Sequence, residues 1–281
     1  MQRGPRTIGE IAMSVITISR GSFSGGKTLA ECLAAKLGYR CIDRDVIVER
    51  AAASGVSQEE LRDALEKPPG FLERFGHKRY KYLVLVQAAL ADEVRTGRVI
   101  YHGLAGHLLL GGGRHILRVR IIAPMGYRVR MVCESLHYSE KQAVAYIENM
   151  DDQRRRWTSW LYGVDWGDPS LYDVVLNLEH MTIDTACHIV SAAAQRRCFE
   201  FTPQCQRALE DLALASKVRA SLAIAPPTEG LELEVTAADG VVAIRGKLAI
   251  PEQLGDVEQI AKAVPGVTAL NLDQLAPPVQ V

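Results

Sequence analysis

The sequence predicts an α/β protein with a parallel, doubly wound sheet, followed by a small α+β domain. From about residue 14 to residue 200, short β-branched apolar runs alternate with helical stretches. That alternation is typical of a parallel sheet with helices on both faces. Near Phe201 the pattern changes to a helix followed by two alternating segments, which indicates a second, separate domain.

The elements of the first domain follow from apolar periodicity and from the residues that interrupt it. The predicted strands cover residues 14–19, 39–42, 98–102, 117–123 and 173–177. The predicted helices cover residues 28–37, 46–53, 58–66, 81–96, 127–135, 139–160 and 182–197. Gly38 and Gly97 are placed to end two of these helices, because glycine adopts the left-handed conformation common after a helix.

The C-terminal block reads α-β-β-α-β. Its elements are predicted at residues 203–223, 231–235, 241–245, 251–263 and 266–272. Asp239 and Gly240 supply the turn of a hairpin between the first two strands. We therefore expect an N-terminal tail over residues 1–13, a first domain over residues 14–200 and a second domain over residues 201–281.

Residues 21–28 read G-S-F-S-G-G-K-T, which matches the phosphate-binding pattern G-x-x-x-x-G-K-[ST]. The segment follows a predicted strand and opens a predicted helix, so backbone N–H groups and the helix N-terminus can hold phosphate. The expected nucleotide-binding residues are Gly21, Ser24, Gly25, Gly26, Lys27 and Thr28. Lys27 is expected to reach the β- and γ-phosphates, and the Thr28 hydroxyl to bind Mg²⁺. The alternative, a glycine turn that binds nothing, does not account for the strand and helix around it.

Composition narrows the class of protein. The 281 residues include 33 basic and 33 acidic side chains, so general nucleic-acid binding is not supported. We expect no transmembrane segment, since no apolar run approaches the roughly 20 residues that a span needs. The first residues lack the apolar core of a signal peptide. Six scattered cysteines without a C-x-x-C pair predict free buried thiols and a cytoplasmic location, rather than a zinc site or disulfide framework.

The first domain resembles the cytidylate-kinase-like family of P-loop nucleoside monophosphate kinases. The likeness rests on six features in the same order: V-I-T-I-S-R-G-S-F-S-G-G-K-T, G-Y-R-C-I-D-R-D, a strand ending at Gly103, V-R-I-I-A-P with Arg128 following, M-D-D-Q-R, and D-W-G-D-P-S-L-Y-D-V-V-L-N. The resemblance implies a P-loop kinase fold, ATP and Mg²⁺ as cofactors, and phosphoryl transfer to a nucleoside monophosphate, foremost CMP or dCMP.

The resemblance also implies roles for three residues. Arg154 falls where the family's lid motif is expected and would steady the transferring phosphoryl group, while Asp151, on the same helix face, would hold its guanidinium. The competing interpretation is a solvated basic run that continues through residues 155–156. Asp43 falls where the family places an acidic acceptor contact. Asp43 is equally well placed to cap the next helix. A further alternative is that Asp43 or Asp45 holds Mg²⁺ through water.

The sequence departs from the family after the third strand. The family commonly has Gly-Arg there, whereas this chain has His102, Gly103 and Leu104. His102 or His107 could compensate for the missing arginine, although both are also candidates for simple packing. The basic residues 77–81 could attract a monophosphate or be a solvated helix start.

The C-terminal block resembles a BON domain, a module associated with membrane, phospholipid or ligand binding. The likeness rests on A-A-D-G-V-V-A-I-R-G-K-L and I-A-K-A-V-P-G-V-T-A-L-N. The glycines Gly240, Gly246 and Gly266 are expected to shape turns and to bind nothing. The block suggests a homo-oligomeric or regulatory contact. An alternative function follows: a catalytically weak ATP-binding regulator whose BON-like domain contacts a partner or membrane.

Overall fold

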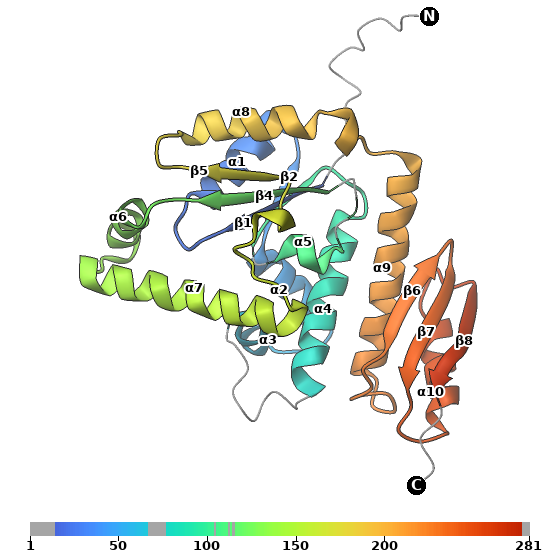
Figure 1. Cartoon of the computed structure of the whole chain (residues 1–281). Coiled ribbons are helices and arrows are strands. Elements are labelled where there is room, and N and C mark those ends of the chain that lie inside the picture. Colours follow the sequence, from blue (N-terminus) through green and yellow to red (C-terminus); the bar gives the residue numbers. More distant parts are fainter. Residues whose placement is uncertain (1–14, 67–76, 104, 112, 114–115, 277–281) are drawn as a thin grey trace, which may run out of the picture. The chain divides into compact units, whose positions relative to one another are not determined.

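The computed structural model describes residues 15–66, 77–103, 105–111, 113 and 116–276 (Figure 1). The chain forms two compact units. The first comprises Met1–Asp43, Thr96–Asp151 and Gly167–Cys205, and the second comprises Arg44–Arg95, Asp152–Trp166 and Gln206–Val281. The predicted tail over residues 1–13 lies outside the described residues, and the domain boundary at residue 200 stays a prediction.

A five-stranded, all-parallel sheet organises the first unit, as the sequence predicts. Its strands are β1 (Val15–Arg20), β2 (Arg40–Asp43), β3 (Val99–His102), β4 (Ile116–Ile122) and β5 (Val174–Asn177), in the order β2-β3-β1-β4-β5. In the register of the sheet, Ile18 of β1 lies opposite His102 of β3 and Val119 of β4. Because all five strands run the same way, the segments that follow them meet at one edge of the sheet.

The helices that begin in the first unit are α1 (Gly26–Leu37), α5 (Gly106–Leu109), α6 (Met125–Leu136), α7 (Glu140–Tyr162), α8 (Ile183–Ala194) and α9 (Pro203–Ile224). Of these, α7 and α9 end in the second unit. Two 3₁₀ turns, Pro169–Leu171 and Arg197–Phe199, complete the unit. The sequence does not predict α5, because its four residues are too short to show helical periodicity.

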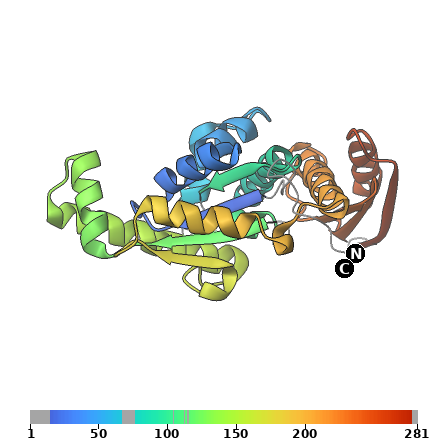
Figure 2. The ribbon, with the colours of Figure 1, turned by 90° about the horizontal axis from the view of Figure 1, so that it is seen from above.

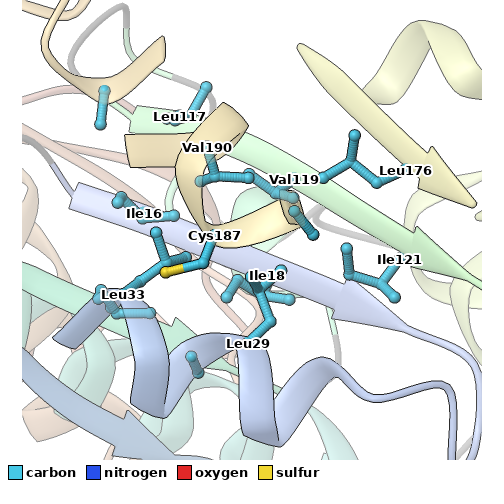
Figure 3. Packing of buried hydrophobic residues seen from close by; sticks show 14 of the residues in the cluster. Ile16, Ile18, Leu29, Leu33, Leu117, Val119, Ile121, Leu176, Cys187 and Val190 are labelled. Carbon is cyan, nitrogen blue, oxygen red and sulfur yellow. The ribbon is translucent and has the colours of Figure 1, made fainter. Parts of the chain in front are cut away.

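Helices α1 and α8 lie side by side over one face of the parallel sheet (Figures 1 and 2). Beneath them is a fully buried core to which β1 contributes Ile16 and Ile18, α1 contributes Leu33, and α8 contributes Val190 (Figure 3). Residues alternate across a strand, so Thr17 between the two isoleucines points to the opposite face. This packing fixes the start of α1 above the end of β1, which positions the phosphate-binding loop.

The prediction that all six cysteines are free is wrong for two of them. Cys32 of α1 and Cys187 of α8 form a disulfide with their Cα atoms 6.3 Å apart. The two residues are separated by 155 positions, and only the packing of α1 against α8 brings them together. Spacing along the chain therefore gives no sign of the pair. The other four, Cys41, Cys133, Cys198 and Cys205, are free as predicted, but none is buried: Cys198 is exposed and the other three are partly exposed.

The second unit contains helices α2 (Arg44–Ala52), α3 (Gln58–Glu66), α4 (His77–Val94) and α10 (Gln253–Lys262), together with the last part of α9. Its sheet consists of β6 (Glu234–Ala238), β7 (Val241–Lys247) and β8 (Ala269–Ala276). Strands β6 and β7 are antiparallel, whereas β7 and β8 are parallel. The C-terminal sequence therefore has the α-β-β-α-β order that its pattern predicts.

The strand predicted at residues 231–235 begins three residues later in the structure. Leu231 and Leu233 are buried, as the alternation indicates, but pairing with β7 starts only at Glu234, opposite Arg245. The core of this sheet receives Val218 and Leu222 from α9 and Val257 from α10. No described helix is long and apolar enough to cross a membrane.

Candidate phosphate-binding site

The loop between β1 and α1 has the geometry of a phosphate-binding loop. Helix α1 begins at Gly26, so the lysine and threonine of the motif lie in its first turn. Ser24 holds the loop closed from inside: it is fully buried, and its hydroxyl donates to the Gly21 carbonyl at 3.0 Å. The N–H of Leu29 donates to the Gly25 carbonyl, which continues the helix from the loop. The first N–H groups of a helix lack partners within the helix, and this is where anions bind.

Two glycines are required by the shape of the loop. Gly25 has φ of +83°, a left-handed conformation that side chains rarely adopt. A Cβ atom at Gly26 would lie 2.3 Å from the Arg20 side chain. Any other residue at either position would therefore distort the loop, which gives a physical reason for the glycine pair in the motif.

Lys27 and Thr28 are exposed at the start of α1. The Lys27 ammonium lies 3.9 Å from the Glu31 carboxylate one turn along the helix, with 68% of its side chain exposed. A surface ion pair of this kind is weak. Lys27 can therefore turn from Glu31 toward an incoming phosphate at little cost in free energy.

A buried arginine links the loop to α7. Arg128 of α6 donates from Nε to the Ser22 carbonyl at 2.8 Å, and its Nη2 lies 2.7 Å from Oδ2 of Asp151. The Ser22 N–H points at the other carboxylate oxygen, at 3.5 Å. Asp151 and Arg128 together therefore hold both polar backbone groups of one loop residue. The family resemblance includes Arg128, but the sequence alone does not assign it this contact.

The structure adds two partners for Asp151 outside its own helix, Arg128 and Ser22. The predicted pairing of Asp151 with Arg154 stays a prediction. Arg154 lies further along α7, in the second compact unit, where its carbonyl accepts from the Thr158 hydroxyl. Its basic neighbours Arg155 and Arg156 both pair with Asp152. The role of Arg154 at the phosphates stays a prediction.

Asp43 and His102 are the last residues of β2 and β3 and lie opposite each other in the parallel register. Asp43 also immediately precedes α2, so its position agrees both with an acceptor contact and with a helix cap. His102 is 6% exposed. Burial, assisted by the charge of Arg20, lowers the pKa of the imidazole below its usual value. We therefore expect a neutral His102 at pH 7.

His107 occupies a different environment, on the face of the sheet opposite α1. Its ring centroid lies 4.8 Å from that of Tyr172, whose hydroxyl donates to Ser19 Oγ at 3.2 Å. Burial, and then the charges of Arg118 and Arg120, lower the pKa of His107 to about 4. The segment from Asp168 to Asp173 thus packs through Tyr172 against the face of the sheet opposite α1. The sequence motif D-W-G-D-P-S-L-Y-D does not predict this structural role.

A double hydrogen bond fastens the end of this segment to β4. The Arg118 guanidinium donates to Asp173 from Nη2 at 2.8 Å and from Nε at 3.1 Å. Burial opposes ionisation of the carboxyl, but the hydrogen bonds from Arg118 outweigh it, and the pKa of Asp173 is lowered. Bidentate pairs of this geometry hold both partners in one orientation. The pair therefore fixes where β5 begins.

The other side of the loop is apolar. A Cβ atom at Gly25 would lie 2.9 Å from Leu178 and 3.0 Å from Ile183, with the Tyr127 hydroxyl at 3.6 Å. These residues follow β4 and β5, whereas Asp43 and His102 end β2 and β3. The loop thus has an apolar side and a polar side.

Several residues singled out in the sequence lie outside the described residues. These are Leu104 and the side chains of residues 77–79. The remaining two residues of the basic segment 77–81 belong to contacts within the second unit: Tyr80 donates to the Leu233 carbonyl, and Lys81 pairs with Glu229. Lys81 is therefore already neutralised by a carboxylate.

A parallel sheet whose first strand leads through this loop into α1 defines a P-loop protein of the kinase type. Residues 15–180 match the cytidylate kinase-like family, and the chain belongs to that family. Residues 210–275 match the BON domain. Family membership supports a kinase with a nucleoside monophosphate kinase-like function.

Named relatives agree with this assignment. The chain is 29% identical over 180 residues to a cytidylate kinase of Thermococcus kodakarensis, covering 64% of this chain and 86% of that protein. It is 28% identical over 181 residues to a cytidylate kinase of Pyrococcus horikoshii, covering 64% and 87%. A crystal structure of an uncharacterized protein from Eubacterium ventriosum superposes with a TM-score of 0.52 at 19% identity, covering 66% of this chain and 99% of that chain. That last likeness concerns the fold alone.

Proposed function

We propose that this protein transfers the γ-phosphoryl group of ATP to a nucleoside monophosphate, foremost CMP or dCMP. The observation that carries the proposal is the loop of residues 21–28, closed by Ser24 and followed by exposed Lys27 and Thr28 at the start of α1. The cytidylate kinase relatives support the choice of acceptor.

The loop residues contribute to ATP binding in different ways. Gly21, Ser24, Gly25 and Gly26 shape the backbone whose N–H groups receive the phosphates. The Lys27 ammonium neutralises charge on the β- and γ-phosphates as it moves away from Glu31. The apolar residues Leu178 and Ile183, close to Gly25, bound the loop on its β4–β5 side, which we assign to the donor nucleotide.

The residues present fit a Mg²⁺ ion bound mainly through the nucleotide. The Thr28 hydroxyl is exposed in the first turn of α1, and Asp43 ends the neighbouring part of the sheet. Within the described ranges, no group of three or more His, Cys, Asp or Glu residues could hold a metal ion. Mg²⁺ in kinases usually takes only one or two protein ligands besides phosphates and water, so Thr28 is sufficient. When bound, the ion neutralises charge that develops on the leaving ADP.

In the transfer, an oxygen of the acceptor phosphate forms a bond to the γ-phosphorus while the bond to the β–γ bridging oxygen breaks. ADP leaves with the electron pair of that bond, and the products are ADP and a nucleoside diphosphate. Because the reaction needs alignment and charge neutralisation more than covalent chemistry, we assign catalysis to Lys27, Asp151 and Arg154. Asp151 acts by holding Arg128 and Ser22 of the loop, Arg154 steadies the transferring group, and Asp43 helps to place the acceptor.

The test is diphosphate formation with ATP, Mg²⁺ and a panel of ribo- and deoxyribonucleoside monophosphates. We expect turnover with at least one pyrimidine monophosphate, and a loss of at least about 10³-fold in Lys27→Ala. Lys36→Ala is the matched control, because Lys36 is exposed at the far end of the same helix. If no acceptor raises turnover above that of Lys27→Ala, the proposal fails.

A regulatory function has one observation in its favour. Tyr80 of α4 donates to the Leu233 carbonyl at 2.8 Å and accepts from Arg219 Nε at 3.0 Å, so the BON-like block is tied to a helix of the kinase region. Tight ATP binding by calorimetry, without turnover on any acceptor, would favour this regulator. Binding to a partner or to liposomes that changes with ATP would then be the next measurement.

A further inference from the structure

His102 ends β3, the strand between β2 and β1, and is a buried polar residue at this edge of the sheet. It lies opposite Asp43 on one side and Ile18 on the other. Its side chain faces the same way as Ile100, two residues earlier, which packs in the core with α1. The imidazole therefore lies on the α1 side of the sheet, where the loop begins its helix.

The Nδ1 atom of His102 is buried and has no hydrogen-bond partner. Buried polar atoms are nearly always paired, so an unpaired one in a folded protein needs an explanation. Four charged groups lie close enough to act on the imidazole: Arg20 from β1, Asp43 from β2, and Lys27 and Glu31 from α1. His102 is thus close to the residue that is expected to hold the transferring phosphate.

His107 provides an internal comparison. It belongs to the same loop region and is also buried with one unpaired ring nitrogen, Nε2. The charges that act on His107, however, are Arg118, Arg120 and Asp173 on the opposite face of the sheet. Of these two histidines, only His102 has its unpaired nitrogen in a ring on which the charge of Lys27 acts.

The two sides of the loop indicate which substrate His102 meets. Leu178 and Ile183 make the β4–β5 side apolar. The β2–β3 side carries the polar residues Asp43 and His102. The donor and acceptor phosphates must meet in line at the loop, so the second phosphate approaches from the side that the donor leaves open. The β2–β3 side offers an acceptor phosphate the charges of Arg20 and Lys27 and an unpaired ring nitrogen, which donates when Nδ1 carries the proton.

We propose that His102 is an acceptor-binding residue whose Nδ1 donates a hydrogen bond to a phosphate oxygen of the acceptor. This inference rests on the proposed function and assigns part of its acceptor site. Acceptor binding satisfies the nitrogen that the free protein leaves unpaired. The Lys27 ammonium, whose charge reaches the imidazole, then acts on the same pair of phosphates.

The test compares His102→Ala, His102→Asn and His102→Gln in the full chain, by steady-state kinetics with ATP and the best acceptor from the panel. Loss of this hydrogen bond in His102→Ala should raise the acceptor KM by about 10- to 100-fold, with the ATP KM unchanged. An asparagine amide occupies the place of Nδ1, so His102→Asn should stay within about 3-fold of wild type. Glutamine places its amide further out and should behave like alanine.

His107→Asn is the matched control, because it changes a buried histidine of the same region on the other face of the sheet. Its acceptor KM should stay at the wild-type value. Thermal unfolding of each variant identifies losses that come from folding alone.

Three outcomes overturn the inference. The acceptor KM of His102→Ala is unchanged, or the acceptor KM rises equally in the asparagine and glutamine variants. In the third, His102→Ala raises the KM for ATP or the Mg²⁺ concentration needed, and not the acceptor KM. Failure of the proposed function is visible separately. Wild-type protein would then transfer phosphate to no monophosphate, and the inference about His102 would fail with it.

Discussion

The phosphate-binding part of the molecule and the BON-like block differ in how they treat buried polar groups. Around the parallel sheet, Thr17, Ser22, His102 and His107 each have a buried side-chain atom without a hydrogen-bond partner. Among the described residues from 206 to 276, no such atom is found. Gln253 of the C-terminal block, for example, uses both ends of its amide, accepting from Ala249 and donating to the Pro227 carbonyl.

This difference is the one expected between a ligand-binding region and a region without a buried ligand site. Unpaired buried polar groups are unfavourable, and those that lie beside the phosphate-binding loop, such as Ser22 and His102, are the ones that a ligand can complete. The BON-like block has a satisfied interior and apolar packing around Val242 and Val257, as expected for a module that acts through its surface. Phosphate binding is therefore expected around the parallel sheet, and contact or regulation in the BON-like block.

The largest expected effect comes from matched cavities in the two cores. Leu33→Ala in α1 and Leu222→Ala in α9 each remove a fully or almost fully buried leucine, and each should lower the free energy of unfolding by about 3 kcal/mol. Only Leu33→Ala should also weaken ATP binding, because α1 carries the loop. Chemical denaturation and calorimetry measure the two effects. Equal ATP affinity in both variants would contradict the assignment of ATP binding to the region around the parallel sheet.

Arg128→Met tests the link between the loop and α7. Without the guanidinium, the Asp151 carboxylate loses its cation and the Ser22 carbonyl loses its donor, so we expect a loss of about 3 kcal/mol and weaker ATP binding. The matched control is Arg130→Met, an exposed arginine on the same helix, which should change stability by less than about 0.5 kcal/mol. Similar unfolding curves for the two variants would show that the buried link is unimportant.

His107 predicts a pH dependence of stability. Its folded pKa is about 4, below the usual 6.5, so between these values the unfolded chain binds a proton that the folded chain does not. Stability from this group is complete above pH 6.5 and is lost as pH falls toward 4. His107→Gln should make the unfolding free energy less dependent on pH in that window. An identical slope in wild type and variant would be inconsistent with a neutral buried His107.

The smallest expected effect is in the second unit. Tyr80→Phe removes the hydroxyl between the Leu233 carbonyl and Arg219, which should cost about 1 kcal/mol while the ring stays under the Arg219 cation. Tyr138→Phe, at an exposed tyrosine, is the control and should be neutral. ATP affinity should not change in either variant. A loss of ATP binding in Tyr80→Phe would show that the two units are coupled.

The parallel sheet and the phosphate-binding loop could be predicted because their signals are local. Strand, loop and helix follow one another within residues 15–37, and glycines at fixed positions mark the turn. The order of the C-terminal elements is predictable for the same reason, although alternation alone placed β6 too early.

The remaining features depend on residues far apart in the chain. The Cys32–Cys187 disulfide and the contact of Arg128 with Asp151 and Ser22 arise only when helices pack. Sequence spacing favoured Arg154 as the partner of Asp151, since three positions separate them on one helix. It could not show that a buried arginine from α6 also reaches that carboxylate.

The most direct test of the central claim follows the phosphoryl group itself. Wild-type protein is incubated with Mg²⁺, CMP and ATP labelled at the γ-phosphate, and the products are separated. We expect the label in the β-phosphate of CDP, and its absence in Lys27→Ala. Label found only in inorganic phosphate, or retained in ATP with every monophosphate tested, would contradict a kinase that acts on these acceptors.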